Sequence, residues 1–194
     1  MIDVVNLQRK VKIELSAYRA FIKELVTAIP ETTERTFSVA FIGDTRMRKL
    51  NELFRGKDST TDVLSFPHEP DEFDVPGSPP YEGGGAAPSS FDGADGVVLS
   101  HSTDPMFAGT NVESHPTAKA APLLRKEGSL NFLGDIVISA EQAERQANEN
   151  DLTLENEIKQ LILHGLLHLC GYDHEADTGE MNAQELELRD KLGI

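Results

Sequence analysis

The amino-acid sequence predicts an α+β fold, with a small mixed sheet of about four strands and about five helices. Strand-like and helix-like segments alternate through the first third of the chain, and three consecutive helix-like segments close it. The 194 residues favour a single domain spanning residues 1–194, and a hydrophobic share of 39% suffices for a core.

Apolar patterns assign the N-terminal elements. IDVVNL at residues 2–7 predicts a strand. Apolar residues near helical spacing predict a helix from Lys12 to Ala28, which Pro30 ends. TFSVAFIG at residues 36–43 is rich in β-branched and aromatic residues and predicts a second strand. Asp44 follows in the position of an N-cap, so we expect the next helix to begin there.

Two further strands, VLSF at Val63 and DIVIS at Asp135, are expected to pair across a long insertion. Nine of the ten prolines and eight of the fifteen glycines fall within residues 67–130, with ten Asp or Glu against three Lys or Arg. This composition buries too little apolar area to offset the entropy lost on ordering, so we expect an acidic, flexible insertion. GVVLS at Gly96 is a candidate short strand within it.

The C-terminal third predicts three helices, each opened by a capping residue. The expected N-caps are Ser139, Asp151 and Asp177. Gly171 is expected to end the second of these helices, because glycine readily adopts the positive φ that a helix stop requires.

A net charge of −15 argues against a surface that binds nucleic acid everywhere, because phosphate contacts need Lys and Arg. The net charge alone is a poor guide, because nearly half of the acidic excess lies within residues 67–130. No DNA partner is expected. A locally basic stretch still occurs at Arg46, Arg48, Lys49, Arg55 and Lys57. It is either a solvated helix face or an edge that faces phosphate groups.

The first residues do not resemble a charged leader, and no apolar run reaches the roughly 18 residues of a membrane span. We therefore expect a cytoplasmic protein with no membrane partner. The single cysteine, Cys170, cannot form an internal disulfide.

Three histidines in LILHGLLHLCGYDHE predict a metal site. His164 and His168 lie four residues apart, so a helix places both rings on one face. Tetrahedral zinc needs ligand nitrogens about 3.3 Å apart, which two such rings reach. A turn at Gly171 can return His174 to the same ion. The spacing H-x3-H-x2-G-x2-H is the one that metzincin proteases use for three zinc ligands.

Two neighbouring residues qualify this prediction. Metzincins place a glutamate base after the first histidine, where this chain has Gly165, so the protease base is missing. Gly165 either leaves room for a substrate or allows close helix packing. Cys170 is a nearby candidate for a fourth ligand, but its position turns it away from the histidines, and core packing is preferred. The alternative to a metal site is that all three histidines are buried in the core and bonded to backbone carbonyls.

An open zinc site, with three protein ligands and one free position, instead indicates a hydrolase, since zinc lowers the pKa of bound water to about 7.

Three blocks of sequence resemble the YbeY family of metal-dependent bacterial endoribonucleases: HGLLHLCGYDH from His164, NELFRGKDSTTDVLSF from Asn51 and LGDIVIS from Leu133. They lie on both sides of the insertion, which is much shorter in the family. The resemblance implies a zincin-like fold with one Zn²⁺ per chain on His164, His168 and His174. It also implies single-strand-specific RNA cleavage, in 3′-end maturation of 16S rRNA and in ribosome quality control, with the small ribosomal subunit as partner.

The resemblance also singles out Arg55, which matches the family's arginine ahead of the TDVLSF block. A guanidinium can bind a phosphate through two hydrogen bonds and stabilise charge that develops on it. The other interpretation is a cation that stabilises a helix C-terminus. Arg55 and His164 are the candidate catalytic residues, and the sequence identifies no general base. Asp62, Asp135 and Asp173 are candidates to orient the histidines.

Two other functions stay open. One is a metallohydrolase of peptides or other esters, against which Gly165 counts. The other is a non-catalytic ribosome assembly factor in which zinc only clamps the C-terminal helices.

Overall fold

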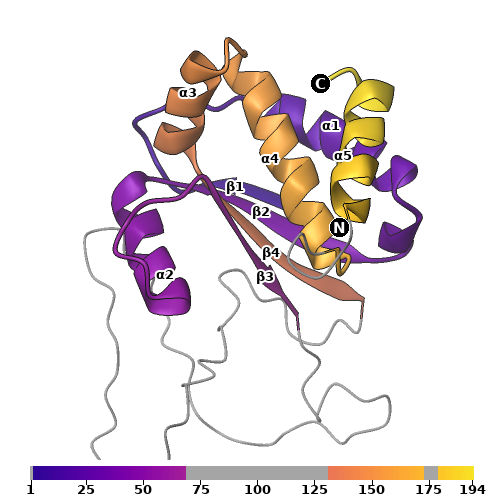
Figure 1. Cartoon of the computed structure of the whole chain (residues 1–194), viewed down its shortest axis with the longest axis horizontal. Coiled ribbons are helices and arrows are strands. Elements are labelled where there is room, and N and C mark those ends of the chain that lie inside the picture. Colours follow the sequence, from indigo (N-terminus) through magenta and orange to yellow (C-terminus); the bar gives the residue numbers. More distant parts are fainter. Residues whose placement is uncertain (1, 69–130, 173–178) are drawn as a thin grey trace, which may run out of the picture.

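The computed structural model describes residues 2–68, 131–172 and 179–194 (Figure 1). Nearly all of the predicted insertion, with its candidate strand at Gly96, lies outside these residues. Three further residues with predicted roles, Asp173, His174 and Asp177, also lie outside them.

A four-stranded mixed sheet forms the centre of the described chain, with the strand order β1-β2-β4-β3. The strands are β1 (Asp3–Asn6), β2 (Thr36–Ile42), β3 (Val63–Pro67) and β4 (Phe132–Ser139). β1 and β4 run parallel to β2, whereas β3 pairs antiparallel with β4, from Val63 opposite Ile138 to Pro67 opposite Gly134. The predicted pairing of the strands at Val63 and Asp135 is therefore confirmed.

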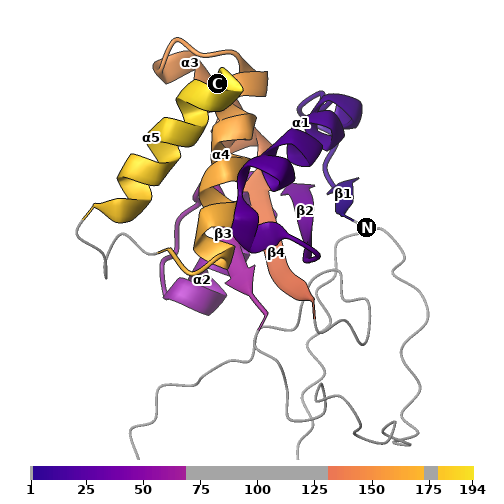
Figure 2. The same cartoon turned by 90° about the vertical axis from the view of Figure 1, so that its right-hand side faces the viewer.

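Five α-helices complete the described chain and confirm the predicted α+β class. They are α1 (Leu15–Ala28), α2 (Asp44–Arg55), α3 (Ala140–Glu149), α4 (Leu154–Leu169) and α5 (Glu180–Leu192), with a 3-10 turn at Pro30–Thr32. Figure 1 shows α1, α3, α4 and α5 on one face of the sheet and α2 on the other. Figure 2 shows α4 between α1 and α5. Among the described helices, none has both the length and the apolar character that crossing a bilayer requires.

The alternating side chains of β4 separate two apolar clusters. Ile136 and Ile138 face the helical layer and pack with buried residues of α4 such as Ile162 and Leu166. Val137 faces the other way and packs with Met47 of α2 and with Ile42 and Leu64 of the neighbouring strands. The central strands are therefore buried on both faces, and the helix α4 is fixed directly against the sheet.

The start of α2 differs from the prediction. Gly43 is the N-cap, and Asp44 is the first helical residue. The backbone amide of Asp44 donates to Oε2 of Glu141 on α3, 2.8 Å away. The Asp44 carboxylate accepts hydrogen bonds from Ser139 and Arg145, at 2.6 and 2.7 Å. Asp44 therefore ties α2 to α3 and to the end of β4, and the carboxylate of Glu141, distant in sequence, accepts from one of the amides that the start of a helix leaves without a partner inside the helix.

Replacing Asp44 with asparagine is expected to lower the free energy of unfolding at neutral pH by about 1–2 kcal/mol, because bonds to a carboxylate are lost. Burial raises the pKa of Asp44, but the bonds from Ser139 and Arg145 outweigh it and leave the pKa below its ordinary value. The stabilisation is therefore complete above about pH 5 and disappears as pH falls through the folded-state pKa. Urea unfolding from pH 3 to 8 should show the variant and the parent converging at acid pH. A difference in free energy of unfolding between variant and parent that stays constant with pH would contradict this. The control is Asp58→Asn, because Asp58 forms an exposed ion pair with Arg48, and such pairs stabilise a fold little.

The boundaries of α4 are set by one unexpected residue and one expected residue. The predicted N-cap Asp151 is wrong: its φ of 55° is left-handed, whereas an N-cap is extended. Thr153 caps the helix instead, and its hydroxyl accepts from the amide of Asn156 at 3.1 Å. At the other end Gly171, with a φ of 94°, turns the chain as predicted. The predicted cap at Ser139 is also confirmed, since its hydroxyl accepts from the amide of Gln142.

Candidate active site

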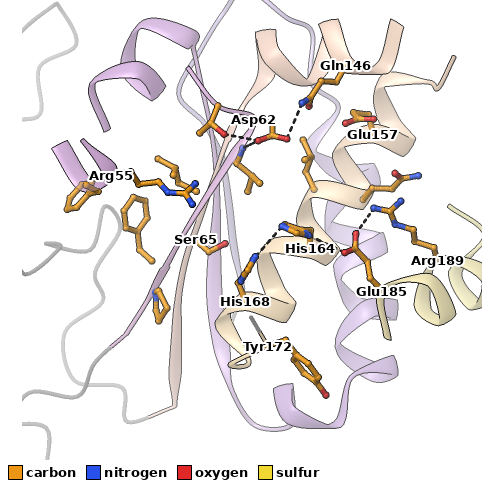
Figure 3. Close-up of a pocket in the computed structure, with 18 of the residues that line it drawn as sticks. Arg55, Asp62, Ser65, Gln146, Glu157, His164, His168, Tyr172, Glu185 and Arg189 are labelled. Carbon is orange, nitrogen blue, oxygen red and sulfur yellow. Dashed lines mark hydrogen bonds and ion pairs between the residues drawn. The ribbon is translucent and has the colours of Figure 1, made fainter. Parts of the chain in front are cut away.

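A cleft of about 980 Å³ opens where β3 faces α4 (Figure 3). Its lining comes from the end of α2, from β3 and the residues before it, from the end of α3, from most of the length of α4, and from α5. Because α4 packs on both β3 and β4, the walls of the cleft are rigid elements of the core. Three of the predicted site residues line this cleft: Arg55, His164 and His168.

His164 and His168 lie side by side on α4, as their spacing predicted. Their Nε2 atoms are 3.2 Å apart and their ring planes are nearly perpendicular, at 80°. Leu163, just before His164, and Leu166 and Leu167, between the two histidines, are fully buried, so packing fixes the backbone that carries both rings. The separation of the two nitrogens is close to the value of about 3.3 Å between ligands of tetrahedral zinc. Within the described ranges no group of three His, Cys, Asp or Glu side chains is placed to hold a metal, and the predicted third ligand His174 lies outside them.

Glu185 of α5 contacts the ring of His164, and sequence reasoning missed it. Its Oε2 lies 3.1 Å from Nδ1 of His164, and its Oε1 accepts from Nη2 of Arg189, one turn along the helix. Burial tends to raise the pKa of Glu185, but the bonds from His164 and Arg189 outweigh it and hold the pKa below its ordinary value. A signal was present in the sequence: Met181, Glu185 and Leu188 share one buried helix face, where a glutamate without a partner would be costly.

Asp62 and Asp135, two of the aspartates predicted to orient the histidines, form hydrogen bonds with other residues. Asp62 accepts from the amide of Val63 at 2.8 Å and from Nε2 of Gln146 at 3.2 Å, so it caps the turn into β3. Asp135 accepts from Ser38 on the sheet face opposite to the one that Ile136 shares with α4. Neither position matches the orienting role, and Asp173 lies outside the described residues.

Gly165 allows close helix packing, which was one of its two interpretations. A Cβ built at this position would lie 2.8 Å from Cγ2 of Ile136 and 3.1 Å from Oγ of Ser65. The hydroxyl of Ser65 also lies 3.2 Å from the carbonyl oxygen of Gly165 and donates to it. The glycine therefore faces the sheet and lets α4 approach β3 and β4. Cys170 is half-buried against the main core cluster, as predicted, and burial raises the pKa of its thiol to about 11.

Replacing Gly165 with valine is expected to lower the free energy of unfolding by about 3 kcal/mol, because three added carbons overpack a filled interface. The matched control is Ala183→Val on the exposed face of α5. It should lower the free energy of unfolding by only about 0.5 kcal/mol, because valine has a weaker helix propensity than alanine. Urea unfolding of both variants measures the difference. If Gly165 instead provided room for substrate, the variant would keep its stability and lose only activity.

Arg55 ends α2 and points toward the cleft from the far side of β3 in Figure 3. It is exposed, and no hydrogen bond or ion pair joins it to the rest of the described chain. Gly56, with a left-handed backbone, caps the helix C-terminus and donates to the carbonyl of Glu52 at 3.0 Å. The guanidinium is therefore not needed to satisfy the helix end. Of the five residues in the predicted basic stretch, only Arg55 is among the described residues that line the cleft. Arg48 instead forms an ion pair with Asp58.

Glu157 is a second carboxyl group in the cleft that the sequence did not reveal. It lies on α4, seven residues before His164, and is 6% exposed. Burial raises its pKa above the ordinary value, which a hydrogen bond from the side chain of Asn150 only partly offsets. The cleft therefore combines two arginines, two imidazoles and two carboxyl groups of perturbed pKa, the types of side chain that acid–base and phosphate chemistry use.

Comparison with known proteins connects this site to one family. The sequence profile described as "Endoribonuclease YbeY" matches residues 3–193. The chain belongs to the endoribonuclease YbeY family. Two relatives named "Endoribonuclease YbeY" come from Caldanaerobacter subterraneus, 30% identical over 192 residues, and from Nautilia profundicola, 32% identical over 162 residues. The first alignment covers 96% of this chain and 94% of the relative, and the second covers 84% and 76%.

A similar fold is found in a solved structure. The solution structure of TM1509 from Thermotoga maritima covers 99% of this chain and 89% of its own, with a TM-score of 0.51 and 22% identity. This likeness concerns the fold alone. The profile match confirms the family resemblance seen in the three sequence blocks.

Proposed function

We propose that this chain is a zinc-dependent, single-strand-specific endoribonuclease that acts in 3′-end maturation of 16S rRNA and in ribosome quality control. Membership of the YbeY family supports RNA as substrate. The observation that carries the proposal is the pair of imidazole nitrogens 3.2 Å apart in a cleft that Arg55 also lines. The expected partners are single-stranded ribosomal RNA and the small ribosomal subunit, in the cytoplasm.

His164, His168 and His174 would hold one zinc ion. The donor set fits: two Nε2 atoms already lie at the separation that tetrahedral zinc requires, about 3.3 Å. Tyr172, two residues before His174 in the sequence, lines the same cleft. When bound, zinc supplies Lewis acidity toward a phosphoryl oxygen and lowers the pKa of a water molecule.

The side chains of the cleft would bind and orient the phosphodiester. The guanidinium of Arg55, which pairs with none of the residues that the structure describes, can donate two parallel hydrogen bonds to a phosphate and stabilise the charge that grows on it during attack by water. Its exposed position suits a substrate that arrives from solvent. A cleft of about 980 Å³ holds a few nucleotide units at most, so an unpaired strand fits better than a duplex. Arg55 also brings a local positive charge to a protein with a net charge of −15.

Metal analysis followed by an RNA cleavage assay tests the proposal. The purified protein should contain about one zinc ion per chain. It should cut a labelled single-stranded RNA, lose this activity with a chelator and regain it with zinc. A duplex of the same sequence, a single-stranded DNA and a peptide panel are the comparison substrates. Cleavage of peptides but not RNA would replace the nuclease with a metallohydrolase of another class. A folded, zinc-loaded protein that cuts none of them would favour a non-catalytic assembly factor.

A further inference from the structure

The contact between α5 and His164 combines two features that simple packing does not require. Glu185 is 6% exposed and lies between the buried residues Met181 and Leu188 on the face of α5 that packs on the core. A buried carboxylate is costly unless its charge is paired and its oxygens accept hydrogen bonds. Here each oxygen has its own partner: Oε1 accepts from Arg189 and Oε2 faces Nδ1 of His164 at 3.1 Å.

The contact has a direct consequence for the protonation of His164. A carboxylate that pairs with a guanidinium can only accept hydrogen bonds, so Nδ1 of His164 must be the donor. A neutral imidazole carries one N–H, and with the proton on Nδ1 its Nε2 is a lone pair. That Nε2 is the atom that lies 3.2 Å from Nε2 of His168. The lone pair is therefore directed to the point between the two rings where a cation would bind.

We propose that Glu185 is a positioning residue that holds His164 in the Nδ1–H tautomer, so that Nε2 is ready to ligate the metal ion. This inference rests on the zinc site of the proposed function and adds to it a residue of the C-terminal helix. Arg189 is the second member of the arrangement, since it fixes the carboxylate from the other side. Figure 3 shows the resulting chain of contacts from His168 through His164 and Glu185 to Arg189.

Zinc affinity provides a test that does not depend on catalysis. Glu185→Gln keeps the shape and one acceptor but loses the negative charge, and we expect a loss of about 10-fold in affinity for zinc. Glu185→Ala removes the acceptor, and we expect up to about 100-fold. The matched control is Glu187→Gln, which removes the same charge from the exposed face of the same helix. Affinity is measured for zinc alone, in competition with a chromogenic chelator, at a temperature where circular dichroism shows every variant to be folded.

The tautomer itself can be observed by NMR with ¹⁵N-labelled histidine. The zinc-loaded parent protein should show His164 with a protonated Nδ1 and a metal-bound Nε2. In Glu185→Ala, the Nδ1 proton should lose the downfield shift that a carboxylate partner causes. Both nitrogens are assigned by comparison with a His164→Gln variant.

Two results would overturn the inference. One is a zinc affinity of both Glu185 variants within twofold of the Glu187→Gln control, with only their thermal stability lowered, as a purely structural ion pair predicts. The other is a His164 signal with the proton on Nε2 in the parent protein. A parent protein that binds no zinc would instead overturn the proposed function, so the two failures are distinguishable.

Discussion

Replacing His168 with alanine is expected to abolish zinc binding and to reduce RNA cleavage by about 10³-fold or more, because a metal supplies several kcal/mol of charge stabilisation. The imidazole that remains at His164 keeps its partner Glu185, so the fold around α4 should persist. Zinc binding should be lost because the ring of His168 supplies the Nε2 atom that lies 3.2 Å from Nε2 of His164. Among the described residues, no group of three His, Cys, Asp or Glu side chains is placed to take over as ligands.

The measurement pairs zinc content with cleavage of a labelled single-stranded RNA. Circular dichroism and a melting curve establish that the variant is folded. His68→Ala is the control, because His68 directly follows β3 and does not line the cleft. Full cleavage by a metal-free His168→Ala protein would contradict the zinc mechanism.

Replacing Arg55 with alanine is expected to lower kcat for RNA cleavage by about 10²–10³-fold, the usual effect of removing one donor that stabilises transition-state charge. Zinc content should stay at the parent level, since Arg55 belongs to α2 and β3 lies between it and α4. The free energy of unfolding should change by less than about 1 kcal/mol, because Gly56 already caps the helix and only a helix-dipole contribution is lost.

Two further variants make this result specific. Lys57→Ala removes an exposed cation two residues away that does not line the cleft, and it should leave kcat unchanged. Arg55→Lys keeps the charge without the planar fork, so it should recover only part of the lost rate. Normal cleavage by a folded Arg55→Ala protein would remove Arg55 from the mechanism and return it to the role of a helix-end cation.

Local patterns in the sequence were sufficient for the order and type of the elements. Apolar spacing located α1, β2 and α4, and the paired strands β3 and β4 were predicted from two short β-branched runs. The two histidines of α4 could be placed on one face because four residues make about one helical turn. Gly171 ended α4 as predicted, since a positive φ is a property of the residue itself.

Predictions failed where a side chain had several possible partners. Asp44 and Asp151 are both good N-cap residues, yet neither caps its helix. Asp44 bonds Ser139 and Arg145, about a hundred residues away in sequence, and Asp151 occupies a left-handed turn. Capping propensity describes a residue in isolation, whereas the folded chain selects the partner with the best geometry.

For the site, the sequence by itself determined the metal-ligand candidates, because the four-residue spacing, the glycine turn and the family blocks are all local. Only the tertiary structure decided that Arg55 shares a cleft with His164 and His168, and that Gly165 faces the sheet. It also decided that Glu185, and not Asp62 or Asp135, holds the Nδ1 edge of His164. The physical reason is that these contacts join α2, α4 and α5 through the packing of a common core, and packing distances between elements are not encoded in the periodicity of any one of them.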